Sequence, residues 1–403
     1  MKIVEVNTCD YGSTGKIMLQ IALCSESICD VITFSRKWRK QSESIINNNF
    51  YFGSYFNNGL HHVMSVFTGY EGCFSAKGTK QLLKKMDKIK PDIIHLHNLH
   101  GWYINIALLF EYIKQNDIKV VWTLHDCWAF TGHCPYFTIA KCDKWKTGCY
   151  NCPQYKEYPQ SLLDNSKKMY WLKKGWFTGV KDLTVVTPSE WLAGLVKQSF
   201  LKDYPVKVIN NGIDLSVFKP TESDFRKRYD IISEEKFILL GVAFGWGKRK
   251  GLDVFIELEK RLDRAKYQIV LVGTDDDVDK QLPSGIISIH RTQNQTELAE
   301  IYTVADLFVN PTREENYPTV NMESIACGTP VITFRTGGSP EILTEKTGMV
   351  VDCDDIDGLQ HSIEKICTQN LFSTADCIEQ AKQFDMNKRF KEYIDLYKEE
   401  YKK

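Results

Sequence analysis

The sequence lacks any apolar run long enough to cross a bilayer, which takes about 20 residues. Its longest candidate is the short run INIALLF. The N-terminal segment, MKIVEVNTCD, also lacks the longer apolar core and the small-residue cleavage site of a secretory signal. These absences predict a cytoplasmic protein. Any attachment to the inner face of the cell membrane would be peripheral.

Net charge is absent as well, since 51 Lys and Arg balance 51 Asp and Glu. Without a basic excess or a recognition motif, the sequence argues against nucleic acid as a partner. The balance is uneven, because residues 1–208 contain 26 Lys and Arg but only 17 Asp and Glu. This asymmetry favours an anionic partner for the first half, either a membrane surface or a phosphate-bearing substrate, although surface charge also drifts without function.

The 403 residues exceed what one hydrophobic core usually holds and predict two domains. Apolar strand-like runs such as KIVEVN, DIIHLHN, FILLGVA and PVITF alternate with stretches of helical spacing. This alternation predicts an α/β protein with parallel sheets covered by helices. The boundary between the domains is expected near Pro205, before VKVINNGID. The last helical stretch, 386–403, is free to pack back on the first domain.

Two carboxylates stand out in the segment REENYPTVNMESIACGTPVITFRTGG. Glu315 is expected in a loop after the strand DLFVNP, because Pro318 delays the following helix. Glu323 is expected about one and a half turns into that helix, which should stop at Gly328. The two carboxylates can therefore face one ligand, whereas a glutamate pair at this spacing is by itself common on solvated surfaces.

This segment resembles the E-x7-E region of the family 4 retaining glycosyltransferases. Further stretches resemble that family in the same order: VVTPSEWLAGLVKQSF, VKVINNGIDLSVFKP, GVAFGWGKRKGLDVFIELEKRL, LVGTDDD and ELAEIYTVADLFVNPTREE. The resemblance implies the GT-B fold, which has two Rossmann-like doubly wound parallel-sheet domains and an interdomain cleft. It also implies that residues 1–205 bind the acceptor and that residues 206–385 bind the nucleotide sugar.

The resemblance implies roles for residues of the second domain. Glu323 would hydrogen-bond the ribose of a UDP- or GDP-linked sugar, and Glu315 would face the reacting carbon. Lys250 would neutralise the departing diphosphate, and Arg249 beside it would replace a family arginine that is Gly245 here. The other implied donor-binding residues are Asn316, Tyr317, Thr319, Val320, Gly273 and Arg291.

The chemistry demands such charges on physical grounds. Breaking a sugar–phosphate bond builds negative charge on the leaving diphosphate and positive charge on the sugar ring. A cation near the first and a carboxylate near the second both lower the barrier. Lys250 and Glu315 have these charges, while the alternative for Lys250 is a solvated lysine in a basic loop.

In the first domain, CDYGSTGKIMLQIA runs from a strand into a helix through Gly12 and Gly15. Its spacing fits neither a P-loop nor a dinucleotide fingerprint. The resemblance implies that both glycines lie against the donor phosphates and that His125 contacts the donor sugar. His97 and Asn98 are expected on the acceptor side, although a histidine at a strand end is often only structural.

A cysteine-rich insert, residues 127–153, contains the spacing C-x7-C-x6-C-x2-C, and its final pair resembles a zinc knuckle. Four thiolates suit a closed structural zinc site, and a reducing cytoplasm disfavours two disulfides. Four thiols without metal are the alternative. The candidate ligands are Cys134, Cys142, Cys149 and Cys152.

Two basic stretches, residues 80–90 and 166–179, mix lysines with apolar side chains. Such segments can lie in an anionic membrane interface. They equally suit ordinary amphipathic helices whose apolar faces pack inward.

Together these features predict a metal-independent, retaining glycosyltransferase of the hexosyltransferase type. It would move a sugar from a nucleotide donor to a glycan or lipid-linked acceptor in surface polysaccharide biosynthesis, with no catalytic cofactor. The alternatives are a nucleotide-sugar epimerase or hydrolase of the same fold, and a non-catalytic nucleotide-sugar-binding subunit.

Overall fold

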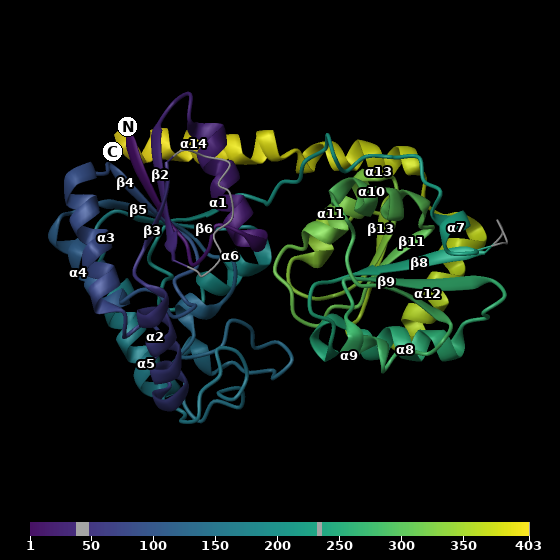
Figure 1. Ribbon diagram of the computed structural model, residues 1–403, viewed down its shortest axis with the longest axis horizontal. Coiled ribbons are helices and arrows are strands. Elements are labelled where there is room, and N and C mark those ends of the chain that lie inside the picture. The colour runs from purple at the N-terminus through teal and green to yellow at the C-terminus, as the bar shows by residue number, and fades with distance from the viewer. Residues whose placement is uncertain (38–47, 232–235, 403) are drawn as a thin grey trace. The chain divides into compact units, whose positions relative to one another are not determined.

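The structure is a computed structural model that describes residues 1–37, 48–231 and 236–402. The chain forms two compact units, one made of Met1–Asn210 with Arg389–Lys403 and the other of Asn211–Lys388. Figure 1 shows that each unit is a sheet with helices on its two faces. The predicted fold class, two doubly wound parallel sheets, is therefore confirmed.

The first sheet has seven parallel strands in the order β3-β2-β1-β4-β5-β6-β7. Their bounds are β1 Lys2–Val6, β2 Asp30–Arg36, β3 Asn49–Phe52, β4 Ile93–Leu96, β5 Lys119–Thr123, β6 Leu183–Thr187 and β7 Val206–Val208. The sequence pattern missed β3, which is a short edge strand. It also assigned residues 206–208 to the second domain, whereas β7 pairs with β6, so the first unit continues to Asn210.

Three helices of the first unit, α2, α4 and α6, begin at side-chain caps. Ser54 accepts a hydrogen bond from the Asn57 N–H at the start of α2, and Gly69 closes that helix in a left-handed conformation. Asn105 caps α4 and Ser189 caps α6 in the same way as Ser54. The helices are α1 Gly12–Ser25, α2 Tyr55–Thr68, α3 Ala76–Ile89, α4 Ile106–Gln115, α5 Ser166–Phe177, α6 Glu190–Val196 and α14 Met386–Lys402.

The second sheet has six parallel strands in the order β10-β9-β8-β11-β12-β13. The strands are β8 Phe237–Val242, β9 Tyr267–Val272, β10 Ile286–Ile289, β11 Leu307–Asn310, β12 Val331–Phe334 and β13 Gly348–Val351. The helices are α7 Phe225–Arg228, α8 Leu252–Arg261, α9 Asp276–Asp279, α10 Gln295–Val304, α11 Thr319–Ala326, α12 Ile356–Gln369 and α13 Thr374–Ala381. Leu239 and Leu240 of β8 enter separate core clusters, as expected for a sheet covered on both faces.

The last helix, α14, contributes to the first unit from residue 389 onward. Its Tyr397 hydroxyl donates to the Glu5 carboxylate of β1 at 3.1 Å, and Glu400 accepts from the Thr184 hydroxyl of β6 at 3.0 Å. These polar groups are buried but hydrogen-bonded, so α14 is bound to the sheet by specific contacts as well as by apolar packing.

Within the described residues, no helix combines the length and the apolar character that crossing a membrane requires.

Candidate active site

An ion pair joins the two residues on which the predicted chemistry depends most. Lys250 ends the 3-10 turn Lys248–Lys250 after β8, and Glu315 lies in the loop after β11, the strand next to β8. The Lys250 Nζ lies 2.6 Å from the Glu315 Oε2. Both side chains are mostly shielded from solvent. The carboxyl ends of parallel strands meet at one sheet edge, which explains why residues 65 positions apart come together.

The carboxylate form of Glu315 is stabilised at this position. Burial alone would raise the pKa of Glu315, but the charge and hydrogen bond of Lys250 lower it below its usual value. The Asn316 N–H donates to the Glu315 Oε1 at 3.1 Å and acts in the same direction. The pair therefore presents a fixed carboxylate and an ammonium group with two further N–H donors.

A buried arginine that the sequence analysis missed holds the Glu315 loop. Arg313 makes two hydrogen bonds of 2.8 Å to the Asp253 carboxylate of α8 and one of 2.6 Å to Asp354. It also donates to the Lys248 carbonyl of the turn that contains Lys250. Arg313 thus fastens the Glu315 loop to the Lys250 turn, and only its position in the REE triplet could have pointed to it.

Two glycines allow the loops to approach closely. Gly251 has a φ of +77°, and a Cβ there would lie 2.6 Å from the Pro311 carbonyl oxygen. Gly337 has a φ of +55°, and a Cβ there would lie 1.8 Å from the Glu315 carbonyl oxygen. A larger residue at either position would push the Glu315 loop away. The Gly-Gly pair after β12 was the sequence signal for Gly337, which was not used.

The second predicted carboxylate, Glu323, is the fifth residue of α11 and accepts from the buried Tyr302 hydroxyl at 3.2 Å. Burial, followed by the charge of Glu323, raises the pKa of Tyr302 well above its usual value, so this hydroxyl stays a donor. Thr319 and Val320 form the first positions of the same helix and are half-buried. Their predicted contacts with the donor, like that of Tyr317, stay predictions.

The remaining predicted donor-binding residues of this unit follow neighbouring strands. Gly273 follows β9 with a φ of +87°, and a Cβ there would lie 1.9 Å from the Ala243 carbonyl oxygen, so only glycine is tolerated. Arg291 follows β10 and is exposed, as is Arg249 beside Lys250. The Arg249 guanidinium donates to the Glu314 carbonyl at 3.2 Å, which places it against the same loop.

In the first unit, the loop after β1 leads into α1 through the two predicted glycines. Gly12 is exposed with a φ of +69°. Gly15 packs so closely that a Cβ would lie 2.6 Å from the Asp10 carbonyl carbon. Asn7, buried at the end of β1, accepts from the N–H groups of Thr8 and Asn98 and links this loop to the end of β4.

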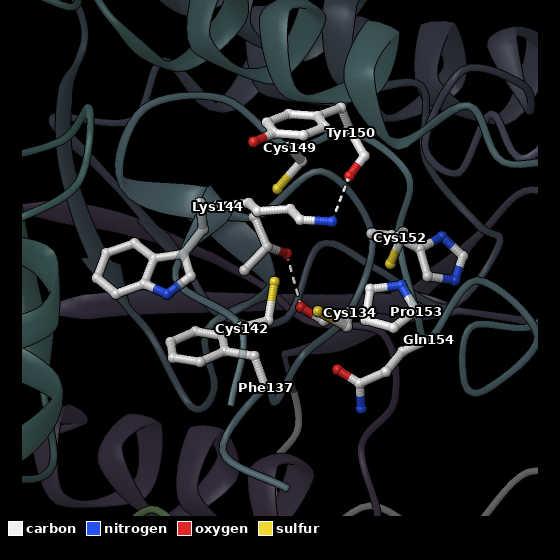
Figure 2. A pocket seen from close by; sticks show the side chains of 12 residues that line it. Cys134, Phe137, Cys142, Lys144, Cys149, Tyr150, Cys152, Pro153 and Gln154 are labelled. Atoms are coloured by element: carbon white, nitrogen blue, oxygen red, sulfur yellow. Dashed lines mark hydrogen bonds between the residues drawn. The ribbon is translucent and has the colours of Figure 1, made fainter. Parts of the chain in front are cut away.

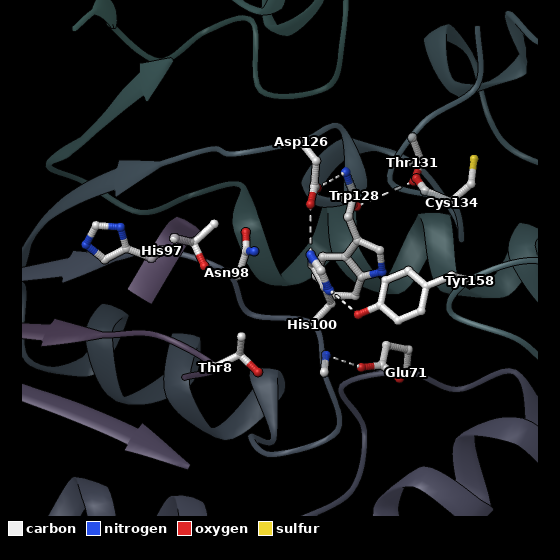
Figure 3. Close-up of polar contacts among 12 residues, drawn as sticks. Thr8, Glu71, His97, Asn98, His100, Asp126, Trp128, Thr131, Cys134 and Tyr158 are labelled. Carbon is white, nitrogen blue, oxygen red and sulfur yellow. Dashed lines mark hydrogen bonds and ion pairs between the residues drawn. The ribbon is translucent and has the colours of Figure 1, made fainter. Parts of the chain in front are cut away.

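A buried row of ionisable side chains runs from the sheet to His125. The Glu5 carboxylate lies 3.5 Å from the His97 Nε2, and the His97 Nδ1 lies 3.1 Å from the His125 Nε2. Burial and the neighbouring histidines hold the pKa of His125 well below its usual value, so the ring is neutral at pH 7. Figure 3 shows His97 beside Asn98, both at the end of β4.

Further polar residues of this unit were not predicted from sequence. His100 lies 2.9 Å from the Asp126 carboxylate and 3.0 Å from the Tyr158 hydroxyl. The buried Glu71 accepts from the N–H groups of Gly101 and Trp102. Figure 3 shows this network next to the 97–100 segment. The HD pair at 125–126 was the sequence signal for Asp126.

The four predicted metal-ligating cysteines line a single cavity within the first unit (Figure 2). None of them is in a disulfide.

The two predicted membrane stretches turn most of their apolar side chains inward. In α3, Leu82 and Met86 are fully buried, so this stretch is an ordinary amphipathic helix. In α5, Met169 and Phe177 are buried while Trp171 is half exposed. The exposed apolar face lies instead on α2, where Phe56, Leu60, Val63, Met64 and Phe67 are exposed.

Comparison with known protein families places this geometry in context. A model described as "Glycosyltransferase Family 4" matches residues 29–217. A second model, described as "Glycosyl transferases group 1", matches residues 235–369. The two matches together span most of the chain, and the gap between them, after residue 217 and before residue 235, lies near the boundary of the two units.

Individual relatives and solved structures agree with these matches. A protein of Escherichia coli K12 described as a colanic acid biosynthesis glycosyl transferase, WcaC, is 22% identical over 76% of both chains. Sucrose-phosphate synthase of Thermosynechococcus elongatus has a TM-score of 0.74 at 17% identity and covers 99% of this chain and 98% of its own. Anabaena HepE, solved with UDP-glucose, has a TM-score of 0.68 at 15% identity and covers 98% of this chain and all of its own.

Proposed function

We propose, because this chain belongs to the family 4 and group 1 glycosyltransferases of the GT-B fold, that it is a retaining, metal-independent transferase. Its donor would be a nucleotide sugar. Its acceptor would be a glycan or a lipid-linked intermediate of surface polysaccharide biosynthesis.

The observation that carries the proposal is the ion pair between Lys250 and Glu315 at the carboxyl edge of the second sheet. A solvent-exposed ion pair usually contributes little to stability. The Lys250–Glu315 pair is instead largely shielded from solvent, and Arg313 holds its loop in place. Shielded charges act strongly on charge that develops in a transition state. The pair therefore offers the cation and the anion that sugar–phosphate cleavage requires.

The donor would occupy the second unit. Anabaena HepE, which shares this fold, was solved with UDP and with UDP-glucose. In our proposal Glu323, held by Tyr302, accepts hydrogen bonds from the two ribose hydroxyls. Gly273 allows a tight turn at the end of β9, because it has no side chain. A nucleotide can therefore approach the backbone at this edge of the sheet.

The proposed transfer step uses these charges. The bond between the anomeric carbon and the phosphate oxygen breaks, and its electron pair stays on the diphosphate, whose charge Lys250 and Arg249 neutralise. The acceptor hydroxyl oxygen bonds to the anomeric carbon on the same face, and its proton passes to the departing phosphate oxygen. Glu315 stabilises the positive charge on the ring during this exchange.

His125 would contribute as a neutral hydrogen-bonding group. Because its pKa is well below the usual value, the ring carries no charge at pH 7. The row through His97 to Glu5 fixes the ring orientation. We propose that His125 positions a sugar hydroxyl of the donor.

The function is tested with a thermal-shift screen of UDP- and GDP-linked sugars, followed by product analysis. A donor present at 100 times its Kd stabilises the folded protein by about 2.7 kcal/mol. Transfer is then recognised by mass spectrometry of a glycosylated acceptor, and retention by NMR of the new anomeric centre. Conversion of the donor without any acceptor would instead support an epimerase or hydrolase.

We further propose that α2 attaches the protein to an anionic membrane surface. Phe56, Leu60, Val63 and Phe67 follow a spacing of three and four residues and form one exposed face. Leu162 and Leu163 extend this face, because the Leu162 N–H donates to the Val66 carbonyl of α2 at 2.7 Å. The excess of Lys and Arg over Asp and Glu in residues 1–208 favours an anionic over a neutral lipid surface.

Co-sedimentation with vesicles tests this attachment. The wild-type protein should sediment with phosphatidylglycerol vesicles and much less with phosphatidylcholine vesicles at physiological salt. The variant Phe56→Ser with Phe67→Ser should lose most binding, while Leu371→Ser, at an exposed leucine of the second unit, should keep it. Equal sedimentation of the double variant and the wild type would contradict the proposal.

A further inference from the structure

The segment between β5 and α5, residues 124–165, is long for a connection that contains only two short 3-10 turns. It is nevertheless well packed, because Phe130, Phe137 and Trp145 are buried against one another. Ordering so long a loop costs conformational entropy, and ordered loops of this length are usually functional. The four cysteines lie in this segment.

The four thiols converge from separate parts of the segment. Cys134, Cys142, Cys149 and Cys152 all line one cavity, together with Trp145 (Figure 2). The thiols of Cys134 and Cys152 interact with each other as hydrogen-bonding partners. Free cysteine commonly packs as a small apolar residue, but here four sulfurs from positions up to 18 residues apart line one cavity.

The backbone around these sulfurs is arranged to donate hydrogen bonds to thiolates and to hold their positions. The Gly132 N–H donates to the Cys149 Sγ at 3.1 Å. Gly132 has no room for a side chain, since a Cβ there would lie 2.2 Å from the Ser166 carbonyl oxygen. Lys144 donates to the carbonyls of Tyr150 and Asn151 and so fixes the turn between Cys149 and Cys152. Such contacts orient ligands and tune them in metal sites.

A buried cation beside the cluster is an independent observation that points to negative charge. Lys173 of α5 is fully buried, and its Nζ donates to the carbonyls of Trp128 at 2.7 Å and Thr131 at 3.1 Å. Among the described residues, no carboxylate forms an ion pair with it. Nearby negative charge favours the charged form of such a buried amine.

We propose that Cys134, Cys142, Cys149 and Cys152 bind one Zn²⁺ as a closed tetrahedral structural site. Four thiolates and one Zn²⁺ carry two net negative charges, which would favour the charged form of the buried Lys173. Cys149 and Cys152 are two residues apart, the spacing with which one turn supplies two ligands. The site takes no part in bond breaking and fixes the 134–152 segment on the first unit.

Metal binding would bring the sulfurs closer together. In the described part of the chain, two groups of three ligand atoms lie within 4.8 Å of one another: Glu5–His95–His97 and Asp276–Asp279–His290. The four cysteines do not form such a group. Zn–S bonds of about 2.3 Å require shorter separations between the four sulfurs. In our proposal, the cysteine side chains rotate within the shared cavity when the metal binds.

Elemental analysis of the full-length protein, purified with reductant and without a polyhistidine tag, tests the proposal. The expected result is about one zinc per chain, retained through dialysis and released when a mercurial reagent blocks the thiols. Cys149→Ser with Cys152→Ser should reduce the zinc content at least tenfold. The matched variant Cys353→Ser, at an exposed cysteine of the second unit, should retain it.

Two results on the wild-type protein would overturn the site, whether or not the variants fold. One is a metal content below one tenth per chain with all thirteen cysteines reactive in denaturant, which identifies free thiols. The other is an intact mass that is lower than the mass of the fully reduced chain by the hydrogens that disulfide formation removes. Neither result bears on sugar transfer, so the zinc site and the proposed function fail separately.

Discussion

Arg313 connects three segments of the second unit through one planar guanidinium group. Its two N–H groups match the Asp253 carboxylate, and the remaining contacts reach Asp354 and the Lys248 carbonyl. Lysine has a single ammonium group and cannot reproduce this planar, bidentate arrangement. Arg313 is therefore a positioning residue, which acts on the reaction through Glu315 and Lys250.

We predict that Arg313→Lys lowers kcat roughly tenfold and leaves KM for the donor within about twofold. The loop that holds Glu315 would shift, and small displacements of a reacting group reduce the rate strongly. Loss of charge-assisted hydrogen bonds should also cost about 1.5–3 kcal/mol of stability. Steady-state kinetics and urea unfolding measure both effects.

Arg335→Lys is the matched control. Arg335 also pairs with an aspartate, Asp352, in the same unit, but both side chains are mostly exposed. Exposed pairs contribute at most about 1 kcal/mol, so this variant should behave like the wild type. Equal losses in the two variants would show that Arg313 has no special part in holding the site.

At the scale of elements, α2 reverses the usual orientation of a surface helix. It turns Asn58, His61 and Ser65 inward and its large apolar side chains outward. The inward His61 accepts from the Gly72 N–H through Nε2 and contacts the Ser75 hydroxyl through Nδ1. Because Nε2 is an acceptor here, the ring must be neutral.

This contact makes the stability of the first unit depend on pH. Burial lowers the pKa of His61 to about 3, whereas it is about 6.5 in the unfolded chain. The unfolded state therefore binds more protons, and stability falls as the pH drops below about 6.5 towards 3. One such group contributes a slope of up to about 1.4 kcal/mol per pH unit.

The prediction is measured as the difference in unfolding free energy between the wild type and His61→Gln at pH 7 and pH 5. The difference should shrink at pH 5, since the variant has no group to protonate. Leu60→Gln, at an exposed position of the same helix without a titratable group, should leave the pH dependence unchanged. A constant difference for His61→Gln would contradict the account of α2.

The helix α14 is the second element with a testable role. The Tyr397 hydroxyl donates to Glu5 and lies 2.6 Å from the His95 Nδ1, while the Tyr393 hydroxyl only accepts from Thr123 at 3.2 Å. Removing the Tyr397 hydroxyl leaves buried polar atoms of Glu5 and His95 without this partner.

Tyr397→Phe should thus destabilise the first unit by about 1–3 kcal/mol, and Tyr393→Phe by less. Chemical denaturation followed by far-UV circular dichroism compares the two variants. A larger effect for Tyr393→Phe would show that packing, and not the row through Glu5, attaches α14.

For the whole molecule, hydrophobic periodicity was sufficient to predict two parallel sheets and most of their strands. It failed at β3, where NFYF is too short to show a pattern, and at β7, whose partner β6 decides which sheet it joins. The apolar face of α2 cannot be distinguished from a core face by spacing alone, because spacing says nothing about which side faces the sheet.

The candidate site was predictable where a residue type itself carries the chemistry, as at Glu315 and Lys250. It was not predictable where the role depends on a distant partner. The Arg313 contact to Asp253 spans 60 positions, and the approach of Gly337 to the Glu315 carbonyl exists only after β11 and β12 pair. Such roles arise from the folded chain and leave little mark on local sequence.

The most direct test of the central claim is the transfer rate of Glu315→Gln and of Lys250→Met with the donor found by the thermal-shift screen. If the two charges stabilise the transition state, each variant loses about 10²–10³ in kcat while the donor still raises its Tm. Wild-type turnover by either folded variant would contradict the account.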